Sequence, residues 1–408
     1  HAAFFDYDLD GDLDCYVLNN SYKNPEKISL IPRDQFDSSA IGGDRLYRND
    51  SPPPTKEGIK NPKFVNVTKE AGIYSNNVGF GLGISVGDVN GDLYPDIYIS
   101  NDFWERDYLY INQKNGKFLE KLPEMMSYTS LASMGSDIAD INNDGHLDIF
   151  STDMLPPDNQ RLKAATKFED YYLYDLKVRQ NYHYQYMQNC LQINQGDGSF
   201  VESSFLANVA ATDWSWGALI FDMNLDGNKD LFVSNGVYHD ITDSDFIDFI
   251  ADQEQVKKIV SEKSKYDFRD FVKFLPPNKR RNYAFLNKGN LSFSNEAASL
   301  NLNQESFSNG SAYSDLDNDG DLDLVVNNVN MSAFVYQNNS TANKQQHFIK
   351  LNFKGQQGNL FGIGATVFVY QKGQMQMAQN LTARGFQSSV APSMTFGFGQ
   401  NPQIDSLR

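Results

Sequence analysis

The sequence predicts an all-β fold built from repeated four-stranded units, the arrangement of a β-propeller. Three observations lead to this prediction. A nine-residue acidic pattern, Asp-x-Asp/Asn-x-Asp-x-x-x-Asp, occurs five times in the 408 residues. Each copy runs directly into a short β-prone segment, such as Ile97-Tyr-Ile or Leu324-Val-Val. Glycine and asparagine recur at fixed places around the copies, which is typical of strands joined by tight turns.

The flanks of the acidic segments repeat as well. In the last four copies a glycine stands five residues before the first aspartate, at Gly83, Gly135, Gly217 and Gly310. Downstream, four segments read as a strand that ends in asparagine, namely Arg45–Asn49, Tyr108–Asn112, Cys190–Asn194 and Tyr283–Asn287. Turn signals such as Asn115-Gly116 then lead into a fourth strand. One unit of four antiparallel strands therefore fills about 50 residues, as a propeller blade does.

Longer intervals between the acidic segments carry insertions. The segment from Asp158 to Asn181 is rich in Lys, Glu, Leu and Tyr, and the segment from Asp243 to Lys263 has apolar residues near helical spacing. Both are predicted to be helical. The polar, proline-containing insertion after Asn20 is predicted to be a loop. Decoration of the propeller rim is the favoured role of all three, with contact to a partner or ligand as the alternative.

The five acidic segments, here called loops one to five, are predicted to bind Ca²⁺. Side-chain oxygens at positions 1, 3 and 5 of a tight loop can turn inwards, a carbonyl at position 7 can join them, and Asp at position 9 closes the shell. A flexible cage of six or seven hard oxygen ligands suits Ca²⁺, whereas Mg²⁺ requires a stricter octahedron. About five calcium sites are therefore expected.

The predicted ligands follow from these positions. The side-chain ligands are Asp6, Asp8, Asp10 and Asp14 in loop one; Asp88, Asn90, Asp92 and Asp96 in loop two; Asp140, Asn142, Asp144 and Asp148 in loop three; Asp222, Asn224, Asp226 and Asp230 in loop four; and Asp315, Asp317, Asp319 and Asp323 in loop five. The carbonyl ligands are those of Asp12, Tyr94, His146, Asn228 and Asp321. The ring of His146 is expected to point away from the ion.

Two alternatives to this interpretation can be weighed on the sequence. An EF-hand needs a glutamate at position 12 and a following helix, but position 12 is Val17, Ile99, Ser151, Val233 and Val326. Aspartate and asparagine can also form turns without a metal ion. However, the five loops contain 19 acidic residues, and such clusters repel one another without a counter-ion. The repeated pattern therefore favours calcium.

Composition excludes some classes of partner. The formal net charge is −17, from 52 acidic and 35 basic residues, which disfavours a nucleic-acid partner. No apolar stretch approaches about 18 residues, so no membrane-spanning segment is predicted. Cys15 and Cys190 allow one disulfide bond, but two unrelated thiols are the favoured interpretation. Because His1 falls inside the first repeat, we expect a fragment of a longer exported protein.

The acidic loops, together with the Leu-Tyr-x-Asn and Asn-Gly-x-Phe hairpins, resemble FG-GAP/VCBS repeats over about residues 1–340. Such repeats build the integrin-α-type β-propeller, generally seven-bladed, with calcium in the loops. Residues 347–352, 359–365, 382–388 and 396–399 resemble the ASPIC/UnbV module. That module follows such propellers in cartilage acidic protein and in bacterial relatives of the Bacteroidetes type. The resemblance implies a propeller in residues 1–340 and a small β module in residues 341–408.

The function implied is that of a calcium-stabilised extracellular or cell-surface protein for binding, adhesion or scaffolding. Its ligand would be a glycan or another surface protein, within an outer-membrane uptake complex. Trp104, Trp214 and Trp216 are candidates for stacking on a sugar, although packing between blades is the favoured role, above all for Trp216. A calcium-dependent polysaccharide lyase is the alternative, with His183 or His239 as the base.

Overall fold

The computed structural model describes residues 1–20, 42–52, 61–76, 78–165, 171–240, 242–244, 275, 277–342, 345–356 and 358–408. Within these ranges the chain is mostly β, with a few short helices. The predicted loop after Asn20 lies outside them as far as residue 41, and so does nearly all of the helix predicted from Asp243 to Lys263. The predictions for these two insertions therefore remain predictions.

Four antiparallel sheets of four strands follow one another along the chain, each with its strands in sequence order from the inside outwards. Their strands are β1 (Ala2–Phe5), β2 (Asp14–Val17), β3 (Arg45–Asn49) and β4 (Phe64–Asn66); β5 (Gly81–Gly87), β6 (Asp96–Asn101), β7 (Tyr108–Asn112) and β8 (Phe118–Glu120); β10 (Ser136–Ala139), β11 (Asp148–Ser151), β13 (Cys190–Asn194) and β14 (Phe200–Glu202); and β15 (Ser215–Phe221), β16 (Asp230–Asn235), β20 (Tyr283–Asn287) and β21 (Phe293–Asn295). A fifth sheet has three strands, β23 (Ser308–Ser314), β24 (Asp323–Asn328) and β25 (Phe334–Tyr336).

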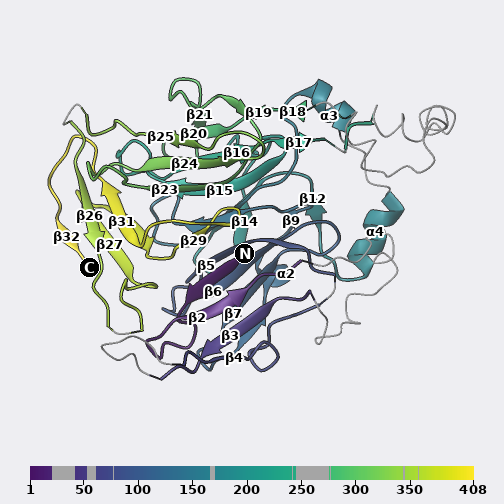
Figure 1. Cartoon of the computed structure of the whole chain (residues 1–408), viewed down its shortest axis with the longest axis horizontal. Coiled ribbons are helices and arrows are strands. Elements are labelled where there is room, and N and C mark those ends of the chain that lie inside the picture. The colour runs from purple at the N-terminus through teal and green to yellow at the C-terminus, as the bar shows by residue number, and fades with distance from the viewer. Residues whose placement is uncertain are drawn as a thin grey trace.

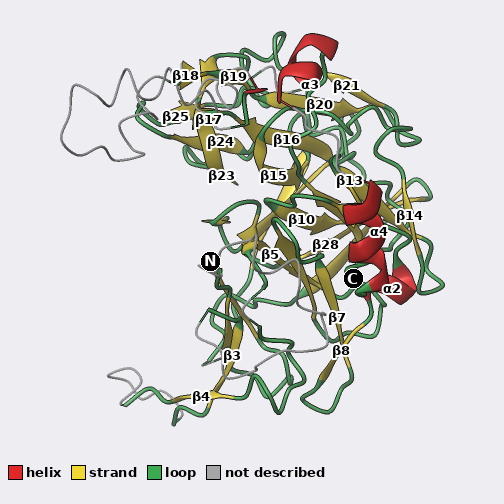
Figure 2. Cartoon of the chain, turned by 90° about the vertical axis from the view of Figure 1, so that its right-hand side faces the viewer, coloured by secondary structure: helices red, strands yellow, loops and turns green. Residues whose placement is uncertain are grey.

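These five sheets form an arc, in which the first strands β1, β5, β10, β15 and β23 are neighbours in that order. Figure 2 shows the sheets following one another from β23–β25 at the top to β3 and β4 at the bottom. Each pair of adjacent sheets encloses its own apolar layer. Between the first and second sheets, for example, Tyr16, Leu46 and Ile97 are fully buried. No single sheet closes on itself within the part of the chain that the structure describes.

The C-terminal strands form separate small sheets. They are β26 (Phe348–Asn352) paired with β31 (Ser393–Gly397); β27 (Thr366–Gln371) paired with β28 (Gln374–Gln379) and β32 (Ser406–Leu407); and the hairpin of β29 (Ala383–Arg384) and β30 (Ser388–Ser389). Figure 1 places β26, β27, β31 and β32 on the left-hand side of the molecule, and α3 and α4 on the opposite, right-hand side.

The hairpin β29–β30 lies where the first strands converge. β29 contacts β1, β5 and β10, and β30 contacts β23. Gly385 donates its N–H to Ser136 O at 2.8 Å, and a Cβ at Gly135 would lie only 3.0 Å from the backbone of Gly385 and Phe386. The Arg384 guanidinium forms a buried ion pair with Asp137. The hairpin therefore joins the C-terminal strands to several sheets at once.

The remaining elements are short. They are the helices α2 (Leu122–Met125), α3 (Asn159–Ala165) and α4 (Tyr171–Arg179), and the strand pairs β9 (Thr129–Ser130) with β12 (Gln185–Tyr186), β17 (Val237–His239) with β18 (Pro277–Asn278), and β19 (Arg280–Arg281) with β22 (Glu305–Ser306). Helices α3 and α4 confirm the helical character predicted for the segment from Asp158 to Asn181. Cys15 and Cys190 are both free thiols, as favoured from the sequence.

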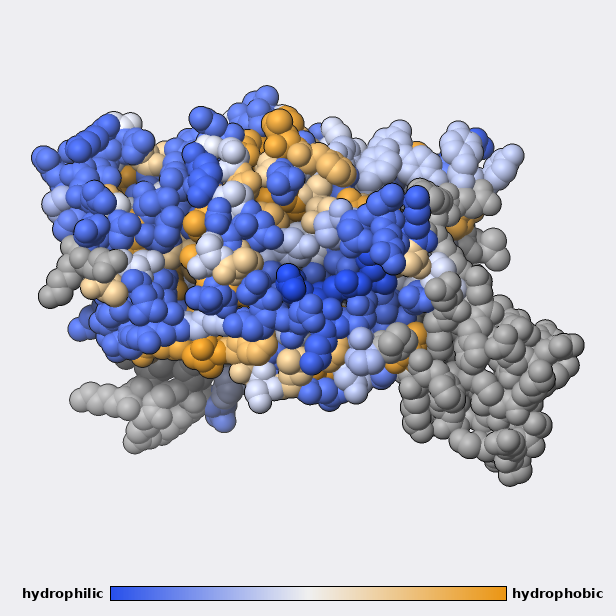
Figure 3. Space-filling view, turned by 90° about the horizontal axis from the view of Figure 1, so that it is seen from above, coloured by the Kyte–Doolittle hydropathy of each residue, from blue (hydrophilic) through white to orange (hydrophobic). Residues whose placement is uncertain are grey.

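The surface agrees with the charged composition. Figure 3, which views the molecule from the top of Figure 1, shows a mostly hydrophilic face with separate hydrophobic patches. Among the described residues, no helix is both long enough and apolar enough to span a membrane.

Candidate metal centre

Each of the five acidic loops joins the first strand of a sheet to the second. Position 1 directly follows the first strand, and position 9 is the first residue of the second strand. The pairing is the same in all five sheets, because position 9 is always opposite the residue before position 1. These pairs are Phe5 with Asp14, Gly87 with Asp96, Ala139 with Asp148, Phe221 with Asp230, and Ser314 with Asp323. The sequence repeat is thus a repeat of loop geometry.

The loop backbone turns through two left-handed residues, at positions 4 and 6. Four loops have glycine at position 6, such as Gly145 with φ 88°. Loop two has its glycine at position 4 instead, Gly91, so Leu93 takes the left-handed conformation at position 6 with φ 74°. A non-glycine residue there costs about 1 kcal/mol. The other four loops have their non-glycine left-handed residue at position 4, as in Leu9 with φ 59°, so every loop combines one glycine and one non-glycine residue in this conformation.

The position-1 carboxylate organises the backbone of loops one to four. In loop three, Asp140 accepts the N–H of Asp144 on one oxygen and the N–H of Gly145 on the other, both at 3.0 Å. Asp6, Asp88 and Asp222 accept the corresponding pairs at 2.8–3.1 Å. These bonds curl the loop around its first aspartate, which is how short acidic loops gather several oxygens.

The carboxyl group at position 9 is buried in all five loops. Asp148 is fully buried and accepts the N–H of Ile141 on Oδ2 and the N–H of Asn194 on Oδ1, both at 2.9 Å. Asp14, Asp96, Asp230 and Asp323 accept the same two N–H groups of their own sheets at 2.8–3.1 Å. This carboxylate therefore ties the loop to the third strand of its sheet.

Positions 3 and 5 lie towards solvent, and so does position 7 except in loop five, where Asp321 is buried. The position-5 carboxylate accepts the N–H of position 7 at 2.8–3.1 Å in all five loops, through Asp10, Asp92, Asp144, Asp226 and Asp319. In the middle three loops the position-3 amide, from Asn90, Asn142 or Asn224, donates to that carboxylate at 2.8–3.0 Å. The ring of His146 packs on Gly196, in the turn between β13 and β14.

Carboxylates come closest together in loops one and five. Oxygens of Asp6, Asp8 and Asp10 lie within 4.8 Å of one another, and so do oxygens of Asp315, Asp317 and Asp323. These two clusters could hold metal ions. In loops two to four an asparagine at position 3 leaves fewer carboxylates at the same place.

Several buried carboxyl groups of the loops have pKa values well above their ordinary range. Burial raises the pKa of Asp14 to about 7, and that of Asp96 and of Asp148 to about 8. Burial and the neighbouring Asp226 carboxylate raise the pKa of Asp222 to about 7. Their ionised forms are thus disfavoured by the protein alone, and a bound cation would compensate that cost.

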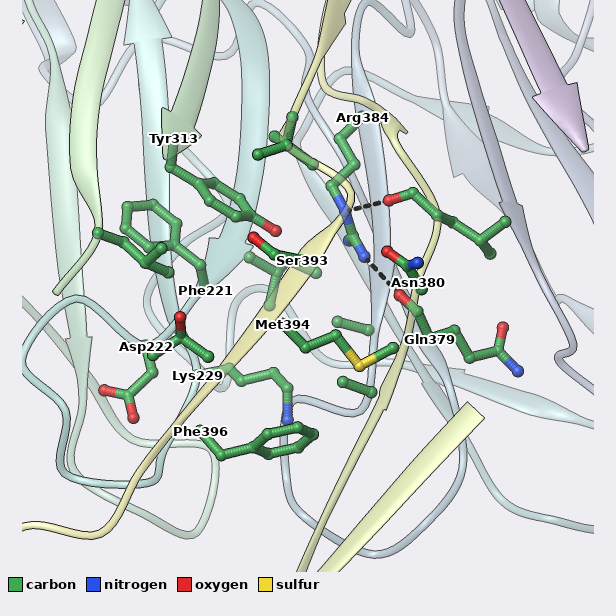
Figure 4. A pocket seen from close by; sticks show the side chains of 18 of the residues that line it. Phe221, Asp222, Lys229, Tyr313, Gln379, Asn380, Arg384, Ser393, Met394 and Phe396 are labelled. Atoms are coloured by element: carbon green, nitrogen blue, oxygen red, sulfur yellow. Dashed lines mark hydrogen bonds between the residues drawn. The ribbon is translucent and has the colours of Figure 1, made fainter. Parts of the chain in front are cut away.

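Basic side chains neutralise part of this charge. Lys229 is half-buried between loops three and four, where burial lowers its pKa although Asp140 and Asp222 raise it. Figure 4 shows Lys229 and Asp222 beside a cavity of about 70 Å³, across which lie Met394 and Phe396 of the C-terminal strands. Arg384, on the far side of this cavity, hydrogen-bonds the Gln379 carbonyl.

Loop five departs from the other four. Asp315 accepts a hydrogen bond from the ammonium of Lys350, on β26, at 2.7 Å. Thr341 donates its hydroxyl to Asp319 and to Asp321 at 2.9 and 3.1 Å. Loop five is therefore bound by side chains from the C-terminal part of the chain, a feature that its sequence pattern does not reveal.

The C-terminal strands touch every loop. Gln379 accepts the N–H of Asp88 at 3.0 Å, and Gly399 donates to Leu225 O at 2.7 Å. In the other three loops, Gly358 packs on Gly11 of loop one, Met375 packs on Gly145 of loop three, and Phe348 packs on Gly320 of loop five. The end of the molecule that carries the acidic loops is therefore covered rather than open.

An asparagine at the end of each third strand links successive loops. Asn194 donates its side-chain amide to Leu147 O of its own loop and to Val89 O of the preceding loop, at 3.1 and 2.7 Å. Asn112, Asn287 and Asn338 make the same two bonds, whereas Asn49 bonds only Leu13 O of its own loop. The sequence displayed these asparagines as a repeat, but their bridging role was not predicted.

The residues considered for sugar binding or catalysis lie outside the loops. Trp104 packs on Tyr182 and beneath the ammonium of Lys177. Trp216 stacks on Trp214, contacts Phe386 and donates to Gly236 O at 2.8 Å. The His183 ring bonds Met126 O, and the His239 ring bonds Leu275 O.

Comparison with known proteins agrees with this repeated geometry. Residues 88–151, from the start of loop two to the end of β11, match the model of an FG-GAP-like repeat. Residues 355–408 match the model called ASPIC and UnbV. The chain therefore contains an FG-GAP-like repeat and an ASPIC/UnbV domain, as the sequence motifs indicated.

Other comparisons are uninformative. None of the curated proteins matches the chain. One solved structure is described as the "structural basis of specific recognition of non-reducing terminal N-acetylglucosamine" by a lectin of Agrocybe aegerita. It is 13% identical, with 100% of this chain and 86% of that chain covered and a TM-score of 0.37. A likeness this distant supports no argument about fold or ligand.

Proposed function

We propose that the protein is a calcium-stabilised binding or scaffold protein without enzymatic activity, with one Ca²⁺ in each of its five acidic loops. The observation that carries this proposal is the common register of the loops, which sets the same oxygen-bearing positions around each loop. The buried carboxyl group at position 9 adds support, because its raised pKa calls for a cation in Asp14, Asp96 and Asp148.

The finer architecture belongs to the same proposal. The order of the strands, from inside outwards, and the neighbouring first strands are those of propeller blades. We therefore assign residues 1–340 to an integrin-α-type β-propeller and residues 341–408 to a separate ASPIC/UnbV module. Calcium would stiffen the loops at the end that the module covers, and an extracellular or cell-surface location would supply calcium in excess.

Recognition is assigned to the surfaces that the module leaves free, namely the rim and the end with α3 and α4. Loops on a rigid scaffold can vary without cost to the core. The ligand would be a glycan or another surface protein, such as a component of an outer-membrane uptake complex. The lyase alternative gains no support from His183 and His239, because both rings bond main-chain carbonyls and neither lies in an acidic loop.

Calcium removal tests the first part of the proposal. Excess EDTA should lower the melting temperature by about 10 °C or more, because each site saturated about 100-fold above its dissociation constant contributes about 2.7 kcal/mol. Calcium should restore the melting temperature, and magnesium at the same concentration should restore much less. Calorimetric titration should count five calcium ions. A melting temperature that ignores both EDTA and calcium would contradict the proposal.

Ligand identity needs a second experiment. The calcium-loaded protein should be applied to a glycan array and, separately, used for affinity capture from outer-membrane extracts. Binding to a defined glycan class that is lost in EDTA supports a glycan receptor, and capture of one surface protein supports a scaffold. Turnover of uronate-containing polysaccharides, abolished by His183→Ala or His239→Ala, would instead establish the lyase.

A further inference from the structure

A polar cavity of about 450 Å³ lies where the third and fourth sheets meet. It is lined by α3, the segment after β17, and the strands β18 and β19. Figure 1 shows α3, β17 and β18 close together on the right-hand side of the molecule. These segments follow the second strands β11 and β16, whereas the acidic loops precede them, so the cavity lies away from the loops. Both sheets have neighbouring sheets on either side, so the cavity involves neither end of the arc.

Charged side chains form a network beside this cavity. Asp213, which is 4% exposed, accepts a hydrogen bond from Arg161 Nε on Oδ2 at 3.4 Å, and Arg280 Nε lies 3.1 Å from the same oxygen. Arg161, which is 9% exposed, also forms an ion pair with Asp240. Asp240 in turn accepts the side-chain amide of Asn278 at 3.0 Å. These side chains therefore hold one another in fixed positions.

The other sheets are built without this network. Asp213 stands four residues before Gly217, and the residues at the same place before the other repeated glycines are Gly79, Leu131 and Ser306. Arg280 stands three residues before the third strand of its sheet, where the first three sheets have Gly42, Glu105 and Met187. Arg161 belongs to α3, and no described residues form a corresponding helix in the other sheets. Since buried charges are costly to desolvate and the repeat does not require them, ligand binding is the better explanation of the network.

The network leaves hydrogen-bonding groups unused at the cavity. Arg280 is held by Nε, and no described residue accepts a hydrogen bond from its Nη1 or Nη2. A guanidinium held in this way offers its two terminal nitrogens as a planar pair of donors. Asp158 caps α3 by accepting the N–H of Arg161 on Oδ1 at 2.7 Å, which leaves Oδ2 as an acceptor, and the exposed Gln160 adds an amide.

The lining selects among ligands by polarity and charge. Among the described residues that line the cavity, only Ala164 and Pro277 are apolar, so the ligand must be rich in polar groups. Four carboxylates, including that of Asp213, face two guanidinium groups, which leaves two negative charges in excess and disfavours an anionic ligand. A cation cannot accept the hydrogen bonds that the arginines offer. Hydroxyl groups both accept and donate, so a neutral ligand with several hydroxyls satisfies the arginine and the carboxylate alike.

We propose that this cavity binds a neutral saccharide unit of a glycan. Arg280 donates hydrogen bonds to its hydroxyl oxygens, Asp158 accepts from its hydroxyl groups, and Gln160 does both. The volume of the cavity falls within the range of about 300–1,000 Å³ that is usual for small-molecule sites. This assignment rests on the proposed function, in which the ligand is a glycan or a surface protein; it selects the glycan and names where it binds.

The test applies the calcium-loaded 408-residue protein to an array of neutral and acidic oligosaccharides and measures each glycan that binds by calorimetric titration. A neutral glycan should bind. Arg280→Met keeps the aliphatic stem and leaves Asp213 paired with Arg161, and it should weaken that binding at least about tenfold. Gln160→Ala, at an exposed helical position, should weaken it at least about threefold. Arg281→Met is the matched control, because Arg281 is exposed, pairs with Glu305 and does not line the cavity; it should change affinity less than about twofold.

Each other outcome has a definite meaning, provided that circular dichroism shows the three variants to be folded. A neutral glycan that binds Arg280→Met and Gln160→Ala as tightly as the unmodified protein lies elsewhere, which overturns this site but leaves the proposed function intact. Binding of acidic glycans alone, or of free lysine in their place, overturns the choice of a neutral ligand. If no glycan binds while calcium still raises the melting temperature, the site alone is wrong. If calcium has no effect either, the proposed function is wrong as well.

Discussion

Loops three and five share one sequence pattern and one strand register, yet their first aspartates are held in different ways. Asp140 accepts two backbone N–H groups of its own loop, whereas Asp315 bonds the Lys350 ammonium from β26. Loop five also has more carboxylates, with Asp at positions 3 and 7 where loop three has Asn142 and His146. The difference shows that the first aspartate of a loop can be held by the loop's own backbone or by a lysine of a neighbouring strand. We expect the two loops to bind calcium differently.

The largest effect should come from pH. A carboxyl group whose pKa is higher in the folded than in the unfolded state destabilises the fold as pH rises from about 4 to its folded pKa. For Asp96 and Asp148 that window ends at about 8. In EDTA the melting temperature should therefore fall between about pH 5.5 and pH 8.5, and the gain on adding calcium should grow over the same range. A calcium effect independent of pH would contradict this linkage.

Substitution of the aspartate at position 9 should have the second-largest effect on stability. Asp148→Asn leaves one acceptor oxygen for the two N–H groups of Ile141 and Asn194 and places an amide donor against the other, which costs about 2–4 kcal/mol. It should also remove one calcium ion in titration. Asp323→Asn should abolish binding in loop five but cost less stability, because its sheet lies at the end of the arc.

Denaturant unfolding of both variants, with and without calcium, measures these differences. Asp197→Asn, at an exposed turn outside the acidic loops, is the matched control. The asparagine keeps the oxygen that accepts the N–H and hydroxyl of Ser199, so stability should change by less than about 1 kcal/mol and stoichiometry should not change. Equal loss of stability in the two position-9 variants would show that the arc is not weaker at its end.

Substitution of the asparagine at the end of the third strand should cost more stability in an interior sheet than in the first sheet of the arc. Asn194→Ala leaves the carbonyls of Val89 and Leu147 without a donor, whereas Asn49→Ala frees only the carbonyl of Leu13. We expect losses of about 2 and about 1 kcal/mol in calcium-loaded protein. If the two losses are equal, the bond to the preceding loop contributes nothing measurable.

The repeated parts of this structure were predictable from the sequence, because each repeat uses the same local chemistry. Asp at positions 1 and 9 marks the strand boundaries, Gly145 and its equivalents mark the left-handed turn, and the phenylalanine after each hairpin marks the fourth strand. Loop two, with Gly91 displaced, still satisfied the pattern because Leu93 adopts the left-handed conformation. Local sequence rules were therefore enough to predict strands and turns wherever several repeats showed the same pattern.

Contacts between distant segments were not predictable in this way. Lys350 lies 35 residues after Asp315, and Arg384 lies 247 residues after its partner Asp137. Neither residue belongs to a repeat, so no second copy shows what it contacts. The covering of the loops by the C-terminal strands likewise depends on how segments far apart in the sequence meet.

The smallest predicted effect returns to loop five. Lys350→Met keeps the aliphatic stem but removes the ammonium from Asp315, so calcium no longer competes with a fixed positive charge. Calcium affinity of loop five should rise by about fivefold to tenfold, while stability in EDTA should fall by about 1 kcal/mol because Asp315 loses its partner. Lys114→Met, which removes an exposed ammonium 3.4 Å from Asp92 in loop two, is the matched control and should change affinity by less than about twofold. If the calcium affinity of loop five falls in Lys350→Met, the lysine positions Asp315 for the ion. Loop five would then resemble the other loops, in which hydrogen bonds hold the first aspartate in place.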